Sequence, residues 1–291
     1  MFTPVETGDG SSTFYSETFG EWFHSREGAR REAQQTYVET TRLAQRARQG
    51  SADIPLKILD VCYGLGYNTA AALETIWRVN DCCRVEIKAL EIDIEAGRSA
   101  ITHQLVQSYS PTAQQVLFDL ATHCTAKRDY LTAEIFLGDA RQQIQPLAEQ
   151  GWQADVIFLD PFSPPHCPQL WTAEFLQLVA QCLDPNDGEL VTYSCAAAVR
   201  SALRLAGLSI GSVQAGGRKW PGTLARYASV GLPALSQQEQ EHLQTRAAVP
   251  YRDPTLRSSA EEILARRSQE QAISPLALTG PWRRRWADSN Q

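Results

Sequence analysis

Residues 57–69 read K-I-L-D-V-C-Y-G-L-G-Y-N-T, and this stretch decides the fold of the chain. Residues 56–61 are mostly apolar and have the length and composition of a buried parallel strand. Gly64 and Gly66 follow at once, and glycine adopts backbone angles that let the chain approach a ligand closely. Asn68 is a good N-cap for an alanine-rich helix. Together these features predict a nucleotide-binding corner, although G-x-G alone also occurs in ordinary strand-to-helix turns.

Length and composition favour one large domain with additions. The chain has 291 residues, of which 43% are hydrophobic, enough to bury a full α/β core. No apolar run approaches the length of a membrane span, and the opening residues M-F-T-P-V-E-T-G-D-G do not resemble a signal peptide. We therefore expect a cytoplasmic protein that does not enter a membrane.

Cysteine and histidine are not spaced as the ligands of a metal site. The seven cysteines include no C-x-x-C pair, and histidine and cysteine come close together only as isolated pairs such as His166 beside Cys167. A single pair without two further ligands is more often a coincidence of a loop. We therefore predict that the protein binds no metal.

The charge of the chain gives no general attraction to nucleic acid. The formal net charge is -6, but arginines are grouped at 26–31, 42–48 and 283–285, where they could form local basic patches. Solvated helix faces explain the same groups equally well.

Strands alternate with helices along most of the chain. Strands are expected at 56–61, 84–91, 134–137, 154–160 and 189–194, with two more at 208–213 and 225–230. Helices are expected at 27–48, after the glycine turn, and at 94–109, 113–125, 171–183 and 196–206. This alternation predicts an α/β fold with a doubly wound, mostly parallel, Rossmann-like sheet that binds ligands at the carboxyl ends of its strands. We divide the chain into an N-terminal extension (1–55), the sheet domain (56–232) and a helical tail (233–291).

Four carboxylates fall where that fold places a ligand. Asp60, Glu91, Asp139 and Asp160 stand at or just after the ends of four predicted strands. Glu91 follows Gly66 by 25 residues, near the spacing at which an acid accepts hydrogen bonds from the ribose hydroxyls of a nucleoside cofactor. Asp139 could accept from an adenine amine. Any one of these residues could instead cap the following helix.

A proline-rich loop, D-P-F-S-P-P-H-C-P-Q-L-W, begins at Asp160. Its prolines restrict the backbone, so Asp160 and Phe162 should be held rigidly at the centre of the sheet edge. A carboxylate and a backbone carbonyl can orient the N–H groups of an amine, while the ring packs against a flat substrate. A turn without a function is the alternative.

Taken together, several motifs resemble a known family. D-V-C-Y-G-L-G-Y-N-T, L-G-D-A, D-P-F-S-P-P-H-C-P-Q-L-W, G-E-L-V-T-Y-S and G-G-R-K-W occur in the order and spacing of the class I methyltransferases related to the methyltransferase half of MnmC. The resemblance covers about residues 9–227. It implies an enzyme that uses S-adenosyl-L-methionine to methylate the 5-aminomethyl group of the wobble uridine, in the anticodon region of tRNA.

The resemblance also assigns roles to residues. It implies that Asp160 holds the amine, and Arg218 and Lys219 match the family's basic segment near the site. With the loop described above, we expect Asp160 to be catalytic and the substrate to be bound by Pro161, Phe162, Ser163, Arg218 and Lys219. The residues expected to bind the cofactor are Asp60, Gly64, Gly66, Asn68, Glu91, Asp139 and Ala140. The expected mechanism is direct displacement, in which the aligned amine attacks the methyl group after Asp160 has taken its proton or selected its neutral form.

This chain departs from the family at three points. Cys62 stands where the first motif usually has glycine, and the residues after Gly231 are too few for the flavin oxidase half of the bifunctional enzyme. We therefore expect this chain to act alone on the aminomethyl form. Its acidic charge is unusual for a tRNA enzyme, so phosphate contacts would have to come from local arginines.

The tail is expected to be helical, with a capping box at Ser258 or Ser259. It ends in P-W-R-R-R-W, whose tryptophans either stack on RNA or dock on the protein. Two other functions stay open. A polyamine synthase of the same fold would act on a free diamine, and a noncatalytic RNA-binding module would bind RNA whether or not the cofactor is present.

Overall fold

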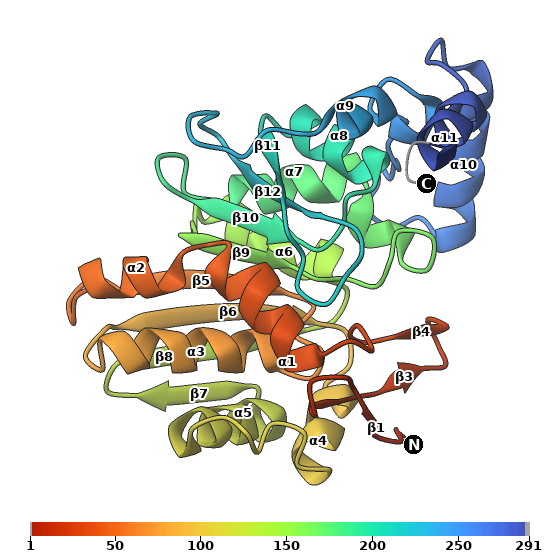
Figure 1. The fold of residues 1–291 in the computed structure, drawn as a ribbon. Helices are drawn as coiled ribbons and strands as arrows, with labels where there is room; N and C mark the ends of the chain where they lie inside the picture. Colours follow the sequence, from red (N-terminus) through yellow and green to blue (C-terminus); the bar gives the residue numbers. More distant parts are fainter. Residues whose placement is uncertain (1, 289–291) are drawn as a thin grey trace.

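The computed structural model describes residues 2–288, and an eight-stranded sheet lies at its centre (Figure 1). The strands lie in the order β11 (Ser209–Val213), β12 (Gly222–Arg226), β10 (Glu189–Thr192), β9 (Val156–Leu159), β5 (Leu56–Val61), β6 (Val85–Glu91), β8 (Leu131–Leu137) and β7 (Thr125–Arg128). The strands from β10 to β8 pair in parallel, while β11, β12 and β7 add antiparallel pairs at the two edges. The predicted doubly wound, mostly parallel sheet is confirmed.

Helices cover both faces of the sheet because its central strands are apolar on both sides. Every residue of β9 is buried, and in β5 Ile58 packs into one core cluster while Leu59 packs into the other. The first cluster includes residues of α3 (Tyr67–Val79), α4 (Glu95–Thr102) and α5 (Pro111–His123). The second includes residues of α6 (Ala140–Glu149), α7 (Ala173–Gln181) and α8 (Ala197–Leu205). With both faces covered, the ends of the strands are left for ligands.

The prediction of a single helix over 27–48 is wrong. The structure has α1 (Ala29–Glu32), the π-helix η1 (Ala33–Glu39) and α2 (Leu43–Gln49), and Arg42 adopts a φ of 55° before α2. The Thr41 hydroxyl donates to the Tyr37 carbonyl at 2.6 Å, a side-chain contact that competes with the helical ladder. The Arg42 guanidinium then reaches Glu189 of β10 at 2.6 Å. The helix is interrupted where this long-range ion pair forms.

Two other predicted elements have clearly different bounds, and one observed strand was not predicted. The helix predicted over 94–109 ends at Thr102, because Gln104 adopts a φ of 57° and turns the chain. The strand predicted over 225–230 is Gly222–Arg226, since Thr223 pairs with Thr192 of β10. β7 has no counterpart among the predicted strands; it pairs with β8 as an edge strand of mostly polar residues, which lacks the apolar signal.

The N-terminal segment lies beside the carboxyl ends of the strands, on the right in Figure 1. It forms two short antiparallel pairs, β1 (Val5–Glu6) with β2 (Ser12–Thr13) and β3 (Tyr15–Ser16) with β4 (Glu21–Trp22). The Tyr67 hydroxyl at the start of α3 donates to the Ser12 carbonyl at 2.8 Å. This contact fixes the segment to the glycine corner.

The tail forms α9 (Gln237–His242), the short 3₁₀-helix η3 (Arg246–Ala248), α10 (Ala260–Ile273) and α11 (Thr279–Asp288). The predicted capping box is confirmed at Ser259, which exchanges hydrogen bonds with Glu262. The tryptophans of P-W-R-R-R-W dock on the protein. The Trp282 ring stacks on His242 with centroids 4.0 Å apart, and the Trp286 indole donates to Glu241 at 2.8 Å.

The division of the chain at 55/56 and 232/233 stays a prediction. Among the described helices, none has both the length and the apolar composition needed to cross a membrane.

Candidate active site

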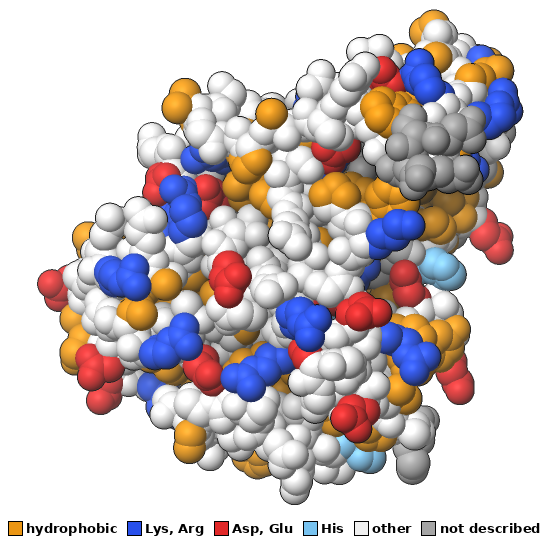
Figure 2. Space-filling view, viewed as in Figure 1, with side chains coloured by type: hydrophobic (Ala, Val, Ile, Leu, Met, Phe, Trp, Pro, Cys, Tyr) orange, Lys and Arg blue, Asp and Glu red, His pale blue; other side chains and the backbone are white. Residues whose placement is uncertain are grey.

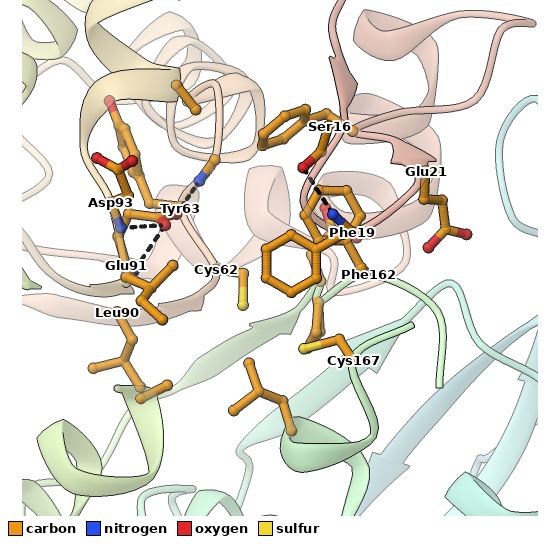
Figure 3. A pocket seen from close by; sticks show the side chains of 18 of the residues that line it. Ser16, Phe19, Glu21, Cys62, Tyr63, Leu90, Glu91, Asp93, Phe162 and Cys167 are labelled. Carbon is orange, nitrogen blue, oxygen red and sulfur yellow. Dashed lines mark hydrogen bonds between the residues drawn. The ribbon is translucent and has the colours of Figure 1, made fainter. Parts of the chain in front are cut away.

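A cavity of about 410 Å³ lies at the carboxyl ends of the parallel strands. Its walls come from the N-terminal segment, the glycine turn, the residues after β6 and the loop that follows β9. Figure 3 shows Phe19, Cys62, Phe162 and Cys167 around one part of the cavity, with Glu91 at its side. The volume is in the range of sites for small molecules, roughly 300–1,000 Å³.

Glu91 ends β6, and the backbone fixes its carboxylate. Its Oε2 accepts from the Gly64 N–H at 2.8 Å, and its Oε1 accepts from the N–H groups of Ile92 at 2.8 Å and Asp93 at 3.0 Å (Figure 3). Burial raises the pKa of Glu91, and these N–H groups oppose the rise because they stabilise the ionised form. Glu91 therefore presents an oriented acceptor to the cavity.

The turn after β5 adopts left-handed backbone angles. The φ angles are 72° at Cys62, 56° at Gly64 and 83° at Gly66, and a Cβ on Gly66 would lie 2.7 Å from the Tyr63 hydroxyl. Cys62 thus occupies a position that favours glycine, the residue usual there in the family the sequence resembles, at a cost of about 1–2 kcal/mol. Gly64 and Cys62 line the cavity, whereas Gly66 lies outside its lining and shapes the turn.

Asp60 lies behind the cavity. It is fully buried, its Oδ2 accepts from the Thr69 hydroxyl at 2.8 Å, and among the described residues its Oδ1 has no hydrogen-bond partner. Burial raises the pKa of Asp60 to about 7. The structure thus places Asp60 where it joins β5 to α3, and the cavity is lined by the other three strand-end carboxylates.

Asn68 is not the N-cap of α3, as the sequence predicts. Gly66 occupies the cap position, because its left-handed angles make the turn, and Asn68 is the second residue of the helix. The Asn68 side chain lines the cavity and donates from Nδ2 to Asp160 Oδ2 at 2.8 Å. Its position thus connects the glycine corner to the loop after β9.

Asp139 and Ala140 line the cavity at the start of α6. Asp139 is the N-cap of α6, and its Oδ1 accepts from the Arg141 backbone N–H at 2.9 Å. The Arg141 guanidinium also contacts both Asp139 oxygens, at 2.7 to 3.1 Å. The capping role that the sequence left as an alternative is therefore present, and Asp139 still faces the cavity.

Asp160 follows β9, and side chains from distant segments hold both of its oxygens. The Tyr37 hydroxyl donates to Oδ1, and Asn68 donates to Oδ2. Burial raises the pKa of Asp160 to about 8, and the charge of Glu32 adds to the rise. The bonds from Tyr37 and Asn68 and the charge of Arg218 oppose it. Asp160 is thus a carboxylate of unusually high basicity inside the cavity.

The loop after Asp160 is held by hydrogen bonds between its backbone and three side chains. The Tyr193 hydroxyl donates to the Pro161 carbonyl at 2.8 Å, and the Trp171 indole donates to the Phe162 carbonyl at 2.7 Å. The Ser163 N–H donates to Glu21 of the N-terminal segment at 2.8 Å. Pro161 and Phe162 line the cavity, but Ser163 does not. The predicted rigidity of this loop therefore depends on three partners as well as on its prolines.

Arg218 and Lys219, predicted together, have different positions. Arg218 lines the cavity, forms an ion pair with the buried Glu32, and stacks its guanidinium 4.0 Å from the centre of the Tyr193 ring. Lys219 is exposed, and its ammonium lies 5.7 Å from the ring of Trp220. The structure brings Arg218 to the site and leaves Lys219 on the surface beside it.

Tyr37, Glu32, Glu21 and Phe19 belong to the site but are absent from the predictions. Phe19 stacks on Phe162 with centroids 4.6 Å apart, and Tyr37 is fully buried. In the sequence, Tyr37 belongs to the apolar stripe of the helix predicted over 27–48, and a tyrosine in such a stripe is usually interpreted as a core residue. A polar group within such a stripe is a signal that a buried partner is needed.

His24 also lines the cavity, where burial lowers the pKa of its imidazole to about 4, so that it is neutral at pH 7. Within residues 2–288, no three histidine, cysteine, aspartate or glutamate side chains come together as a metal site would require.

Comparisons with known proteins agree with this geometry. The model of a family described as S-adenosyl-L-methionine-dependent methyltransferases matches residues 98–228. A crystal structure of MnmC2 from Aquifex aeolicus is 32% identical and superimposes with a TM-score of 0.81, covering 94% of this chain and 86% of that one. This chain belongs to the MnmC-like methyltransferases. As such an enzyme it uses S-adenosyl-L-methionine, and the predicted family and cofactor are confirmed.

This chain covers different shares of the length of two relatives. An uncharacterized protein of Methanocaldococcus jannaschii is 30% identical over 272 residues, which are 91% of this chain and 71% of that protein. The tRNA 5-methylaminomethyl-2-thiouridine biosynthesis bifunctional protein MnmC of Azoarcus is 29% identical over 281 residues. This MnmC-like methyltransferase covers 42% of the length of that bifunctional protein.

Proposed function

We propose that this methyltransferase acts on the 5-aminomethyl group of the wobble uridine in tRNA and converts 5-aminomethyl-2-thiouridine to 5-methylaminomethyl-2-thiouridine. The observation that carries the proposal is the half-buried Asp160, whose two oxygens are held by Tyr37 and Asn68 in a cavity that also contains the Phe162 ring. The name of the Azoarcus relative supports the choice of substrate. A cytoplasmic location, where tRNA is found, is part of the proposal.

The residues around the glycine turn fit the nucleoside part of the cofactor. Glu91 carries an oriented acceptor suited to the ribose hydroxyls, and Asp139 with Ala140 lies where an adenine amine could be bound. Gly64 has no side chain that would fill the cavity at the turn. When bound, S-adenosyl-L-methionine supplies a methyl group on a positively charged sulfur. Asn68 and Cys62 complete this part of the wall.

Asp160 fits the task of handling a proton on an amine. An alkylammonium is mostly protonated at pH 7, so it must lose a proton before its nitrogen can act as a nucleophile. A carboxyl group whose pKa is about 8 accepts that proton at a smaller cost than an ordinary aspartate, whose pKa lies near 4. Asp160 would first bind the ammonium as an ion pair and then hold its proton.

The aromatic side chains beside Asp160 fit a flat base. Phe162 stacks on Phe19, and Phe23 contacts Phe162 edge to face with centroids 5.0 Å apart. A pyrimidine ring that packs against this cluster would lie in the cavity that Asp160 also lines. Base stacking on an aromatic side chain contributes about 1–3 kcal/mol.

The contact with tRNA rests on a smaller set of residues. Arg218 is committed to Glu32, whereas Lys219 and Trp220 next to it are exposed, the latter by 56% of its surface. Figure 2 shows basic and acidic side chains intermixed on the face it displays, so affinity for RNA would come from local contacts of this kind. An exposed aromatic beside a cation suits an unpaired nucleotide of the anticodon region.

The test is methyl transfer to tRNA that carries 5-aminomethyl-2-thiouridine, with labelled S-adenosyl-L-methionine. Mass spectrometry of the nucleosides should show one added methyl group on that nucleoside and none on tRNA that lacks the aminomethyl group. A parallel assay offers the enzyme putrescine together with the decarboxylated form of the cofactor. Transfer to putrescine without transfer to tRNA would establish the polyamine synthase, and cofactor-independent RNA binding without transfer would establish the binding module.

A further inference from the structure

Arg141 connects the cofactor side of the cavity to the tail of the chain. Its Nη2 donates to Asp139 Oδ2 at 2.7 Å, and its Nη1 donates to Asp253 Oδ2 at 2.7 Å and to the Ser258 carbonyl at 2.9 Å. Asp139 lines the cavity, while Asp253 lies 112 residues further along the chain from Arg141. One guanidinium thus bridges the start of α6 and the segment before α10.

Asp253 is built into its position. It is fully buried, and its Oδ1 accepts from the Ser258 N–H at 3.1 Å and the Thr255 hydroxyl at 3.2 Å. Its own N–H donates to Glu174 of α7 at 2.7 Å. Both carboxylate oxygens therefore have partners, and the side chain cannot turn without breaking several bonds. A buried charge held in this way is costly to leave unpaired.

Asp139, by contrast, is partly open to solvent. Its side chain is 36% exposed, and the helix cap uses only Oδ1. The Arg141 Nε lies 3.1 Å from each of its oxygens, so the planar guanidinium sets the plane of the carboxylate. Arg141 has this orientation because Asp253 and Ser258 hold its other nitrogen. Of the three charged side chains, Asp253 is the one with no exposed surface.

We propose that Asp253 is a positioning residue of the cofactor site: acting through Arg141, it orients Asp139 toward the nucleobase, and the segment 251–258 thereby sets the preference of the enzyme for an adenine amine. The proposal rests on the role given to Asp139 under the proposed function and is independent of the tRNA substrate. The tail is then part of the cofactor site, although Asp253 does not line the cavity.

The test compares the affinities of two ligands by calorimetry. S-adenosyl-L-homocysteine carries the amine, and S-inosyl-L-homocysteine carries a carbonyl oxygen in its place, which an acceptor such as Asp139 repels. The wild type should bind the adenosyl ligand roughly 10- to 100-fold more tightly, the range expected for a hydrogen bond to a charged group. In Asp253→Asn and Arg141→Gln this ratio should fall to about threefold or less.

Matched controls separate this effect from loss of structure. Arg128→Gln removes an ion pair with Asp119, at 2.5 Å, outside both the segment 251–258 and the cavity lining, and should keep the wild-type ratio. Glu91→Gln should weaken both ligands by the same factor. Because both affinities are measured on one preparation, their ratio is insensitive to the fraction that is folded. Arg141→Lys keeps the charge but not the planar fork, so it should also lose the preference if orientation is what matters.

Two results would overturn the proposal. If Asp253→Asn and Arg141→Gln kept the ratio within about twofold of the wild type, Asp139 would not depend on the bridge. If the wild type showed no preference, Asp139 would not bind the amine at all. Neither result bears on methyl transfer to tRNA, which needs its own assay.

Discussion

The Tyr37 hydroxyl donates a hydrogen bond to Oδ1 of Asp160, although 123 residues separate the two along the chain. Tyr37 is fully buried, and burial raises the pKa of its hydroxyl well above the usual range, so it remains a donor at any pH of interest. The bond stabilises the ionised form of Asp160. Tyr37 therefore adjusts the basicity of the residue to which we assign the chemistry.

Replacing Asp160 should affect turnover more than cofactor binding. Asp160→Asn keeps the shape and much of the hydrogen bonding but removes the charge and basicity, so turnover should fall on the order of a hundredfold or more. Methyl transfer at saturating cofactor, with calorimetry of cofactor binding beside it, measures both. Phe162→Ala is the comparison variant, which should weaken substrate binding by about 1–3 kcal/mol. Wild-type turnover in Asp160→Asn would remove this residue from the mechanism.

Removing the Tyr37 hydroxyl should shift the pH profile. In the wild type, kcat/KM should rise with pH until Asp160 ionises, near pH 8. Tyr37→Phe deletes a bond that lowers the pKa of Asp160, so the rising limb should move to higher pH. Profiles from pH 6 to 9.5 check this, with Tyr15→Phe, an exposed tyrosine of β3, as the control. A limb that stays in place or moves to lower pH would contradict the assignment.

Glu91 should contribute to cofactor affinity. Glu91→Ala removes the acceptor proposed for the ribose hydroxyls and should weaken S-adenosyl-L-methionine binding by about 1–3 kcal/mol. Calorimetry on Glu95→Ala, a surface change in α4, gives the baseline. Unchanged affinity in Glu91→Ala would mean that this carboxylate only braces the turn through Gly64.

Asp60 should make stability depend on pH. The pKa of Asp60 in the folded state is about 7, above that of an aspartate in the unfolded state, near 4. Asp60 therefore stays protonated to a higher pH in the folded state, and the free energy of unfolding decreases as the pH rises from about 4 to 7. Asparagine does not titrate. The free energy of unfolding of Asp60→Asn minus that of the wild type should therefore increase by up to about 1.4 kcal/mol per pH unit in this window and level off above it. Urea titrations at pH 5, 6, 7 and 8 measure this difference, which a flat profile would refute.

The exposed residues after Arg218 should contribute to tRNA binding. Trp220→Ala should cost about 1–3 kcal/mol if the ring stacks on a base, and Lys219→Ala should reduce the salt slope by about 0.7–0.9 if it meets one phosphate. Filter binding at several salt concentrations gives both quantities. Ile273→Ala changes an even more exposed apolar residue, at the end of α10, and should alter neither. No change in any variant would place the RNA on another face.

Sequence patterns predict the parts of the site that short-range geometry determines. Gly64 and Glu91 follow from the strand, the turn and the spacing to the next strand, and the structure joins them with a hydrogen bond of 2.8 Å. Asp60 and Asp160 show where this reasoning fails. Both stand at the end of a strand, but only Asp160 lines the cavity, because Asp60 is directed to Thr69 of α3. A difference of one position along a strand reverses the face, and strand ends are uncertain by more than that.

Partners that come from distant segments could not be predicted. Tyr37 and Glu32 look like residues of an amphipathic helix, and only the folded chain shows that they contact Asp160 and Arg218. The break at Arg42 was equally hidden, since it accompanies an ion pair with Glu189. These contacts depend on how the N-terminal extension packs against the sheet, which no local pattern specifies.

The π-helical turn at 33–39 makes the length of this segment as important as its composition. A π-helix winds with hydrogen bonds from i to i+5, so it accommodates a residue that an α-helix in the same place would not. Deleting one residue before Tyr37 would rotate the following side chains by about 100° around the helix axis. The Tyr37 ring would then no longer contact Asp160, although every residue of the site would still be present in the sequence. An insertion or deletion can thus abolish this contact where no substitution has occurred, and a comparison of sequences that scores identities alone would overlook the loss.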